Sequence, residues 1–280
     1  AALAGQVQAA VREATPATYR QALKRLAPGD ELRLAGGVYR RGLAVHGLTG
    51  TLSAPIVISG PAAGVPAMLL AEHTHNTVSI VDAAHVVIRH LTLDGRNIPV
   101  DAVKCEGHAA FAHHITLEYL RIQGHGATQQ TVGISTKCPA WGWVIRGNVI
   151  RGAGTGIYLG NSDGSDPFIG GLIEGNVVSD SLGYNLQIKH QQARPALPGM
   201  PEGAMETVIR NNVLLKQAPP REGAVPRPSV LLGHWPLSGP GATDRYVVER
   251  NTFHGNPVES LLQAEGNVVI RDNVFLAPDG

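Results

Sequence analysis

The chain has 280 residues, and 43% of them are hydrophobic, which is enough apolar material for a large interior in one domain or two. Its 23 Lys and Arg residues nearly balance 22 Asp and Glu residues, so no overall positive field indicates a nucleic-acid partner. No apolar run of about 18 residues predicts a membrane span, and the 34 glycines and 19 prolines indicate many turns.

Residues 6–28 carry the first pattern along the chain. Tyr19, Ala22, Leu23 and Leu26 have helical spacing, and Pro28-Gly29 ends the pattern. We therefore predict a short amphipathic helix over roughly 16–26.

From residue 87 onward a short motif repeats: two apolar residues, a polar residue, any residue, Asn or Leu, then two apolar residues. The copies recur at intervals of 22 to 39 residues, a period typical of solenoids. They are short, β-branched and punctuated by Gly and Asn, which excludes helical repeats. We therefore predict an all-β, single-stranded right-handed parallel β-helix with about three short strands in each coil. The key positions are Leu91, Leu120, Asn148, Asn176, Asn212, Asn251 and Asn273.

The five asparagines are predicted to lie at a tight bend between two strands. Asn tolerates a left-handed backbone conformation, and its amide can hydrogen-bond to the next Asn in the stack. The repeat predicts a single β-helix domain over 1–280, with coils over 29–280. The open end of a solenoid exposes apolar interior and strand edges, so we expect the segment 6–28 to cap it.

Two Pro-rich segments interrupt the period, near 191–203 and 217–228. Pro cannot donate to a strand ladder, so both are predicted to be loops that leave the solenoid. Insertions in repeat folds usually gather on the face that binds, and we expect both loops beside the site.

A third loop, 161–167 (NSDGSDP), follows a central strand and offers Asn161, Asp163 and Asp166 as substrate contacts. Asp163 and Asp166 are also candidates for the paired carboxylates of a glycoside hydrolase or for calcium binding. Asp, Gly, Ser and Pro are equally what an ordinary turn uses.

Cys105 and Cys138 are the two cysteines, and neither has a metal-ligand spacing, which argues against a zinc site. The two cysteines are either two separate small residues, buried or in turns, or they form a disulfide between coils. The pair His113/His114 has no third ligand at a useful spacing, so we expect these side chains to face solvent and expect no metal site.

Each coil carries one further strand, and the alternation of side chains along it predicts which residues face outward. The outward positions form two columns when the coils are stacked. The first column contains Lys104, Ser135, Tyr158, Gln187, Leu232 and Gln263, and the second contains Glu106, Lys137, Gly160, Lys189, His234 and Glu265.

One exposed sheet thus presents lysines, a tyrosine and a histidine within a few coils, and Gly160 leaves room for a ligand. Polar groups along such a groove bind sugars, and lysines attract uronic acid carboxylates. A solvated sheet face would also be polar, so that interpretation stays open. The predicted catalytic residues are Lys189, His234 and Tyr158. The predicted substrate contacts are Lys104, Lys137, Gln187, His190, Asn161, Asp163, Asp166 and Gln263.

The amino-terminal coils carry two motifs with a more specific likeness. Residues 28–39 (PGDELRLAGGVY) and 50–60 (GTLSAPIVISG) resemble the first coils of secreted β-helix enzymes that act on acidic polysaccharides, the family of chondroitinase B and related alginate lyases. The resemblance covers the first 60 residues well and the later coils by repeat pattern. It implies a secreted or periplasmic protein, which we expect to be a monomer that binds a polysaccharide or oligosaccharide and neither nucleic acid nor membrane.

In that family a lysine removes the proton α to the uronate carboxyl before β-elimination. Residues 184–189 (YNLQIK) resemble the strand that carries it, which implies Lys189 as the base. The family's calcium ligands fall here at Tyr184 and Leu182, and its arginine falls at Gly233 beside His234, so calcium is not supported and no other cofactor is implied. The resemblance implies a lyase or a C5-epimerase. A glycoside hydrolase using Asp163 and Asp166, or a non-catalytic glycan-binding β-helix, is the alternative.

Overall fold

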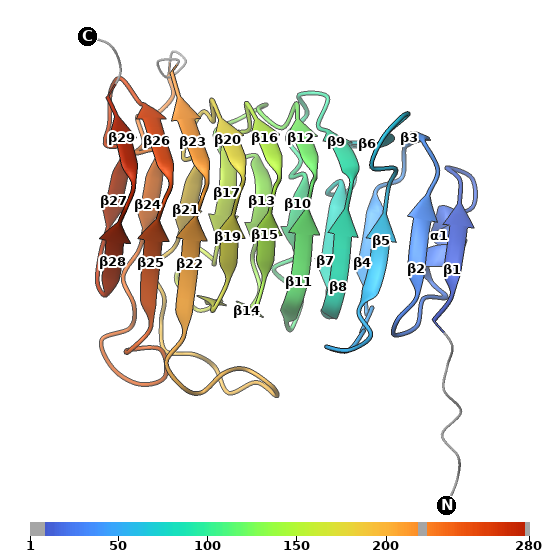
Figure 1. Ribbon diagram of the computed structural model, residues 1–280, viewed down its shortest axis with the longest axis horizontal. Helices are drawn as coiled ribbons and strands as arrows, with labels where there is room; N and C mark the ends of the chain where they lie inside the picture. The colour runs from blue at the N-terminus through green and yellow to red at the C-terminus, as the bar shows by residue number, and fades with distance from the viewer. Residues whose placement is uncertain (1–8, 218–222, 278–280) are drawn as a thin grey trace, which may run out of the picture.

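The computed structural model describes residues 9–217 and 223–277, which form three parallel sheets around one interior. Figure 1 shows the coils stacked along the long axis, from β1 near the N-terminus to β27, β28 and β29 near the C-terminus. The predicted all-β class is confirmed, and the three parallel sheets fit the predicted right-handed parallel β-helix.

The three sheets are named here A, B and C, and a coil passes through them in the order C, A, B. Sheet A contains β1 (Val11–Ala14), β2 (Glu31–Leu34), β5 (Ile56–Ser59), β8 (Ala83–Arg89), β11 (Ala112–Glu118), β14 (Ala140–Trp141), β15 (Val144–Arg146), β18 (Phe168–Ile169), β19 (Leu172–Glu174), β22 (Glu206–Arg210), β25 (Arg245–Glu249) and β28 (Val268–Arg271). Sheet B contains β3 (Gly37–Tyr39), β6 (Ala67–Leu70), β9 (Leu91–Asp94), β12 (Arg121–Gln123), β16 (Val149–Arg151), β20 (Val177–Ser179), β23 (Val213–Lys216), β26 (Thr252–Gly255) and β29 (Val274–Leu276). Sheet C contains β4 (Leu43–His46), β7 (Val78–Val81), β10 (Val103–Cys105), β13 (Val132–Thr136), β17 (Thr155–Leu159), β21 (Leu186–Ile188), β24 (Val230–Leu232) and β27 (Leu262–Ala264).

The N-terminal helix α1 (Tyr19–Leu23) has five residues and is shorter than predicted. Strand β1, which pairs with β2, occupies part of the segment expected to form the cap. The Tyr19 hydroxyl donates to the Gly42 carbonyl at 2.8 Å, and Tyr19 and Leu23 are buried. Capping by this helix stays a prediction. None of the described helices is long and apolar enough to cross a membrane.

The coils turn from sheet A into sheet B at a corner that repeats the same backbone conformation. The residue before each key position of the repeat has a positive φ, between 54° and 64°, for example 62° at Gly147 and 64° at Gly175. The prediction that the asparagines themselves take the left-handed conformation is wrong. The preceding residue takes it, and this frees the Asn side chain to point along the stack. The seven left-handed residues are His90, Tyr119, Gly147, Gly175, Asn211, Arg250 and Asp272.

The asparagine side chains are hydrogen-bonded from one coil to the next. The Asn176 amide nitrogen donates to Asn212 Oδ1 at 2.9 Å and to the Ile145 carbonyl at 2.8 Å. Asn176 Oδ1 accepts from the backbone N–H and the amide of Asn148, at 2.9 and 3.0 Å. Asn148 and Asn176 are almost fully buried, so each bond satisfies a group that water cannot reach. The same contacts continue through Asn251 to Asn273.

A column of charged side chains lies on the outer side of the same corner. Each of these side chains belongs to the last residue of a sheet A strand. Glu174 accepts from Arg146 at 2.6 Å and from Arg210 at 2.8 Å, the residues above and below it in the ladder. The sign alternates from coil to coil, so each carboxylate lies between two guanidinium groups. The column contains Arg89, Glu118, Arg146, Glu174, Arg210, Glu249 and Arg271.

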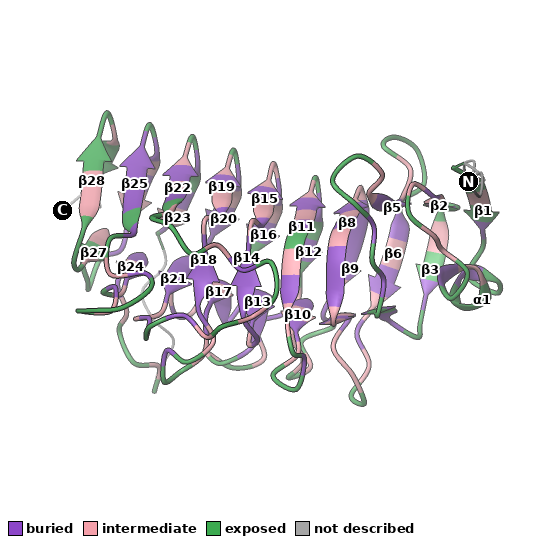
Figure 2. Ribbon diagram, turned by 90° about the horizontal axis from the view of Figure 1, so that it is seen from below, coloured by how far each residue is buried: buried purple, intermediate pink, exposed green. Residues whose placement is uncertain are grey.

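The C-terminal coil is more exposed than the middle of the stack, as Figure 2 shows for β28. Side chains that would face an interior in a central coil, such as Phe275 and Ile270, are 45% and 46% exposed. Water can therefore reach the last rung of the asparagine column, and this gives an internal control for its energetics.

We predict that Asn176→Ala lowers the free energy of unfolding by about 2–3 kcal/mol, because it removes four buried hydrogen bonds to three neighbouring residues. Asn273→Ala should cost about half as much, since water can replace the lost bonds at the partly exposed end. Chemical denaturation of both variants measures the difference. Equal losses would show that the bonds between buried asparagines do not stabilise the stack.

Candidate functional site

The outer face of sheet C brings the predicted first column together over four coils. Lys104 pairs with Ser135, Ser135 with Tyr158, and Tyr158 with Gln187 in the strand register. The strands bury the alternate positions, among them Ile134 and Ile157, because these apolar side chains fill the interior. The register thus confirms one column from β10 to β21, although Ser135 is fully buried and Gln187 is almost fully buried.

The column prediction is wrong at β24, whereas Gln263 in β27 lies in the predicted column because it pairs with Leu231. Gln187 pairs with Leu231, and Leu232 is fully buried although it was expected to face outward. Because side chains alternate, burying Leu232 shifts the following residues by one position. His234 therefore stacks on His190, with 5.4 Å between ring centroids, and does not lie in the column of Lys189. Its Nδ1 is 3.0 Å from the Trp235 carbonyl.

A groove of 430 Å³ lies over β10, β13, β17 and β21. Four of its lining residues are cationic, and Asp101 is its one carboxylate among the described residues. The groove therefore carries a local positive charge although the chain as a whole is almost neutral. The lining residues are Asp101, Lys104, Gln129, Gln130, Val132, Lys137, Thr155, Tyr158, Ser162, Gly183, Tyr184, Gln187, Lys189 and Arg227.

Lys137 lies in the groove with its Nζ 3.4 Å from the centroid of the Tyr158 ring. The pKa of Lys137 is lowered to about 8, mainly by burial and also by the positive charges of Lys104 and Lys189, while Asp101 and Asp166 oppose the shift. A substantial fraction of this amine is therefore neutral near physiological pH. Burial raises the pKa of Tyr158, so the phenol stays protonated there.

Asp101 is held at the edge of the groove by two contacts. Its Oδ1 accepts from the Val132 N–H at 2.8 Å, and its Oδ2 lies 3.6 Å from Lys104 Nζ. Burial raises the pKa of Asp101, although both contacts and the charge of Lys137 oppose that rise. Asp101 thus compensates part of the cationic charge and fixes the Lys104 side chain.

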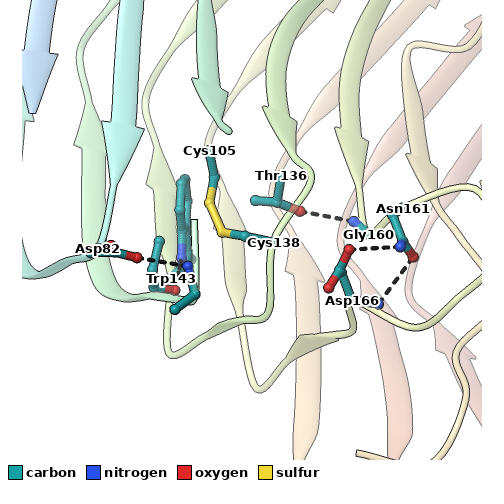
Figure 3. Close-up of a disulfide and its surroundings, with 10 residues drawn as sticks. Asp82, Cys105, Thr136, Cys138, Trp143, Gly160, Asn161 and Asp166 are labelled. Atoms are coloured by element: carbon teal, nitrogen blue, oxygen red, sulfur yellow. Dashed lines mark hydrogen bonds between the residues drawn. A yellow bond between two sulfur atoms is a disulfide. The ribbon is translucent and has the colours of Figure 1, made fainter. Parts of the chain in front are cut away.

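Gly160 separates Lys137 from Lys189 in the second column. Its φ is +86°, and a Cβ placed on it would come within 3.3 Å of Lys189 Cβ. Its N–H donates to Thr136 Oγ1 at 2.8 Å, as Figure 3 shows, which holds the strand end against the coil before it. Gly160 is buried and is not among the lining residues of the groove, so the room for a ligand at this position stays a prediction.

Cys105 and Cys138 form a disulfide, with 6.1 Å between their Cα atoms (Figure 3). The bond ties the end of β10 to the segment just after β13, and Cys138 directly follows Lys137. Both cysteines are fully buried. The disulfide therefore fixes the backbone that places Lys137 in the groove.

The loop 161–167 is organised by hydrogen bonds within itself. The Asn161 amide donates to Asp166 Oδ2 at 2.6 Å, and the Asp166 N–H donates to Asn161 Oδ1 at 3.0 Å (Figure 3). Asp163 accepts from the N–H and hydroxyl of Ser165, which lowers its pKa. These contacts are those of an ordinary turn.

Of the eight predicted substrate contacts, Lys104, Lys137 and Gln187 line the groove. The other five, His190, Asn161, Asp163, Asp166 and Gln263, are not among the lining residues in the described part of the chain. Of the predicted catalytic residues, Tyr158 and Lys189 line it and His234 does not.

The described end of the segment 217–228 borders the groove through Arg227, as predicted for this insertion. Its Cζ lies 5.6 Å from the centroid of the Tyr184 ring. Lys216 and Gln129, which were not predicted to be site residues, hold this segment against the groove. Lys216 Nζ, almost fully buried, donates to the carbonyls of Gly183 and Arg227 at 2.7 and 3.0 Å. The Gln129 amide donates to the Val225 carbonyl at 2.6 Å.

The segment 191–203 packs on another face, so the prediction that it borders the same site is wrong. Met200 belongs to a separate apolar cluster with Trp141 and Ile169, outside β14 and β18 of sheet A. The buried Arg194 holds the segment by pairing with Asp244 and by donating to backbone carbonyls. The outer side of β14 and β18 is apolar and would be exposed to water without this insertion, which explains why the insertion folds back onto sheet A.

The residues at the expected calcium positions do not fit a calcium ion. Calcium prefers carboxylate and carbonyl oxygens, but Leu182 offers an apolar side chain and Tyr184 a phenol whose ring faces Arg227. A side chain at Gly233, the expected arginine position, would meet the backbone of His190 at 2.2 Å.

No protein-family model and no curated protein sequence matches the chain. Its structure is similar to that of an alginate lyase from Paenibacillus sp. str. FPU-7, with a TM-score of 0.57, 16% identity, and coverage of 96% of this chain and 98% of the lyase. A GH136 lacto-N-biosidase from Eubacterium ramulus has a TM-score of 0.49 at 12% identity, covering 96% and 68% of the two chains. A pectate lyase has a TM-score of 0.49 at 10% identity, covering 94% and 78%. The predicted resemblance to β-helix proteins of the alginate lyase kind is thus confirmed at the level of the fold.

We predict that the lowered pKa of Lys137 makes the protein more stable as the pH rises from about 8 to 10.5. In this window the unfolded chain still binds the proton that the folded protein has released, so raising the pH favours the folded state. Urea denaturation across this range should show the wild type gaining stability relative to Lys137→Met. A constant difference between the two proteins would contradict the lowered pKa.

Proposed function

We propose that this protein is a carbohydrate-active β-helix that abstracts the proton α to the carboxyl of a uronate in an acidic polysaccharide, and that β-elimination follows. The observation that carries the proposal is Lys137, an amine with a pKa of about 8 inside a cationic groove and directly over a tyrosine ring. The similarity to an alginate lyase supports this substrate class, because alginate is an acidic polysaccharide.

The neutral amine of Lys137 acts as the base in this reaction. It takes the proton from the carbon next to the carboxyl group, the carbon–carbon double bond forms, and the bond to the leaving glycosidic oxygen breaks. Tyr158 remains protonated at neutral pH and donates its phenolic proton to that oxygen. Proton return from Lys137 to the phenolate, directly or through water, restores both groups.

The remaining cations of the groove compensate the charge of the carboxylate. Removing the α proton places a second negative charge near the carboxyl group, and fixed positive groups stabilise that charge in the transition state. Lys189 and Arg227 are free of the carboxylate contact that engages Lys104, in the part of the chain that the structure describes. We assign the contact with the substrate carboxylate to these two residues.

Lys189 stays a second candidate for the base, because the sequence resemblance implies that role. The two lysines flank Gly160 in one column and both line the groove, so a sugar ring bound there can contact both. Burial within the groove, which lowers the pKa of Lys137, favours Lys137 as the base. Single variants of the two residues decide between the assignments.

We further assign the protein to a secreted or periplasmic location. The buried disulfide between Cys105 and Cys138 supports this assignment, because such bonds persist mainly in oxidising compartments. Polysaccharides with uronic acids are substrates outside the cytoplasm, which agrees with the proposed activity. A monomer remains the expected state.

The direct experiment incubates the protein with alginate, pectate and glycosaminoglycans in deuterated water. Ultraviolet absorbance of unsaturated uronates reports elimination, and NMR reports deuterium at the carbon next to the carboxyl group. Deuterium without unsaturation would show an epimerase. New reducing ends without either signal would support a glycoside hydrolase using Asp163 and Asp166, and binding without turnover would support a glycan-binding protein.

We predict that Lys137→Met lowers turnover by about 10²–10⁴, the range of a lost general base, with little change in melting temperature. Lys189→Met should mainly raise KM, since it removes a contact made with the bound substrate. Lys24→Met, at the end of α1 and outside the groove, is the matched control. Full activity of Lys137→Met together with loss of turnover in Lys189→Met would show that Lys189 is the base.

The pH profile gives an independent check of the base. Because Lys137 must be neutral, the wild-type rate should rise as the pH increases through about 8 and then level off. Asp101→Asn removes a negative charge that raises the pKa of Lys137, so the increase in rate should move to lower pH. A rise that does not move in the variant would contradict the assignment of Lys137.

A further inference from the structure

Three histidines meet at a bend within sheet A, away from the groove on sheet C. His85 comes from β8, and His113 and His114 come from the neighbouring strand β11. One ring nitrogen of each lies within 4.8 Å of a ring nitrogen of the other two. The expectation that the pair 113/114 lacks a third ligand is therefore wrong, because His85 is 28 residues earlier in sequence but in the adjacent coil.

The contacts among the three rings are close. His113 Nδ1 and His114 Nδ1 are 2.8 Å apart, and the rings of His85 and His114 stack with 4.5 Å between centroids. A tetrahedral zinc ion with Zn–N bonds of about 2.1 Å requires nitrogens about 3.4 Å apart. The His113–His114 separation is shorter than this, and the three ligand nitrogens all lie within 4.8 Å of one another, so side-chain rotations would bring them to the separation that zinc requires.

The backbone at this bend does not require histidine. His85 and His114 have φ values of +53° and +52°, and the equivalent position of the next coil is Gly142, with φ +64°. Gly170 follows in the coil after that, with φ +59°. A left-handed conformation costs an ordinary residue about 1–2 kcal/mol, whereas glycine adopts it freely. His85 and His114, in two successive coils, thus carry a cost that Gly142 and Gly170 avoid at the same corner of the next two coils.

The surroundings support ligands that are neutral and fixed. The His113 ring stacks on Trp141 at 4.5 Å between centroids, at the border of the apolar cluster that holds the segment 191–203. Burial, followed by the charge of neighbouring histidines, lowers the pKa of both His113 and His114, in His113 to about 4. Both shifts favour the neutral imidazole, which is the form that binds a metal ion.

We infer that His85, His113 and His114 form a binding site for one divalent transition metal ion, with zinc as the natural occupant. Three imidazole nitrogens suit zinc, nickel, copper and cobalt, and do not suit the oxygen-preferring calcium and magnesium ions. The ion would join β8 to β11 and so connect two consecutive coils. It would lie on sheet A and play no part in the chemistry proposed for the groove.

The test is a titration of tag-free protein with zinc, followed by calorimetry, and with cobalt, followed by its visible absorption spectrum. We expect one equivalent of metal to bind, a higher melting temperature with zinc, and a cobalt spectrum typical of nitrogen ligands. His85→Gly and His114→Gly should each weaken binding at least about tenfold and abolish the thermal shift. Glycine is the appropriate replacement because Gly142 occupies the same corner in the next coil.

The matched control is His90→Gly. His90 also has a positive φ, +56°, and stacks on the next coil through Tyr119 at 5.1 Å, but it belongs to no three-ligand group in the described chain. Unchanged binding in this variant, with loss in the other two, supports the site. Absence of binding by the wild type, or equal binding by all the variants, overturns it. Should the glycine variants not fold, X-ray absorption of the zinc-loaded wild type decides, because fewer than three imidazole ligands would also overturn the site.

Discussion

The structure depends on keeping every coil in register with the next. At the corner between sheets A and B, three consecutive residues do this together: a charged residue outside, a left-handed residue at the turn, and an asparagine inside. The charges alternate in sign from coil to coil, and the asparagine amides bond along the stack. A slip by a whole coil would place like charges together, and a slip by one residue would turn every asparagine outward. Packing of apolar side chains supplies most of the stability, but these polar contacts select one register.

That register is what creates the groove on sheet C. Lys137 faces outward because Thr136 and Cys138 on either side of it are buried, and the disulfide from Cys105 fixes this alternation. The same alternation places Gly160 and then Lys189 beyond it. Burial of the Lys137 amine among other cations is the cause of its lowered pKa. The proposed chemistry thus rests on the packing of the coils, which places both lysines in one groove.

Most of the fold, but only part of the site, could be predicted from the sequence. Periodicity and β-branched runs predicted the parallel β-helix, and alternation predicted the outward column from Lys104 to Gln187, since both depend on local side-chain spacing. The column failed at β24, where Val230 and Leu232 were both needed in the interior. The lowered pKa of Lys137 depends on burial, which spacing does not reveal. Contacts across coils, such as those of Lys216 or of His85 with His114, join residues far apart in sequence, and only the stacking register brings them together.

The arrangement of cations argues for a polymer as the ligand of the groove. Lys104, Lys137, Lys189 and Arg227 come from four different coils, and adjacent coils are about 4.8 Å apart. A small anion could contact one or two of these groups, whereas a chain of charged sugars can contact all four. Since each coil adds one residue to each column, a β-helix can place charges of one column at multiples of the coil spacing along its axis. A groove of this kind therefore suits a ligand whose own charges repeat, as the carboxylates of a polyuronate do.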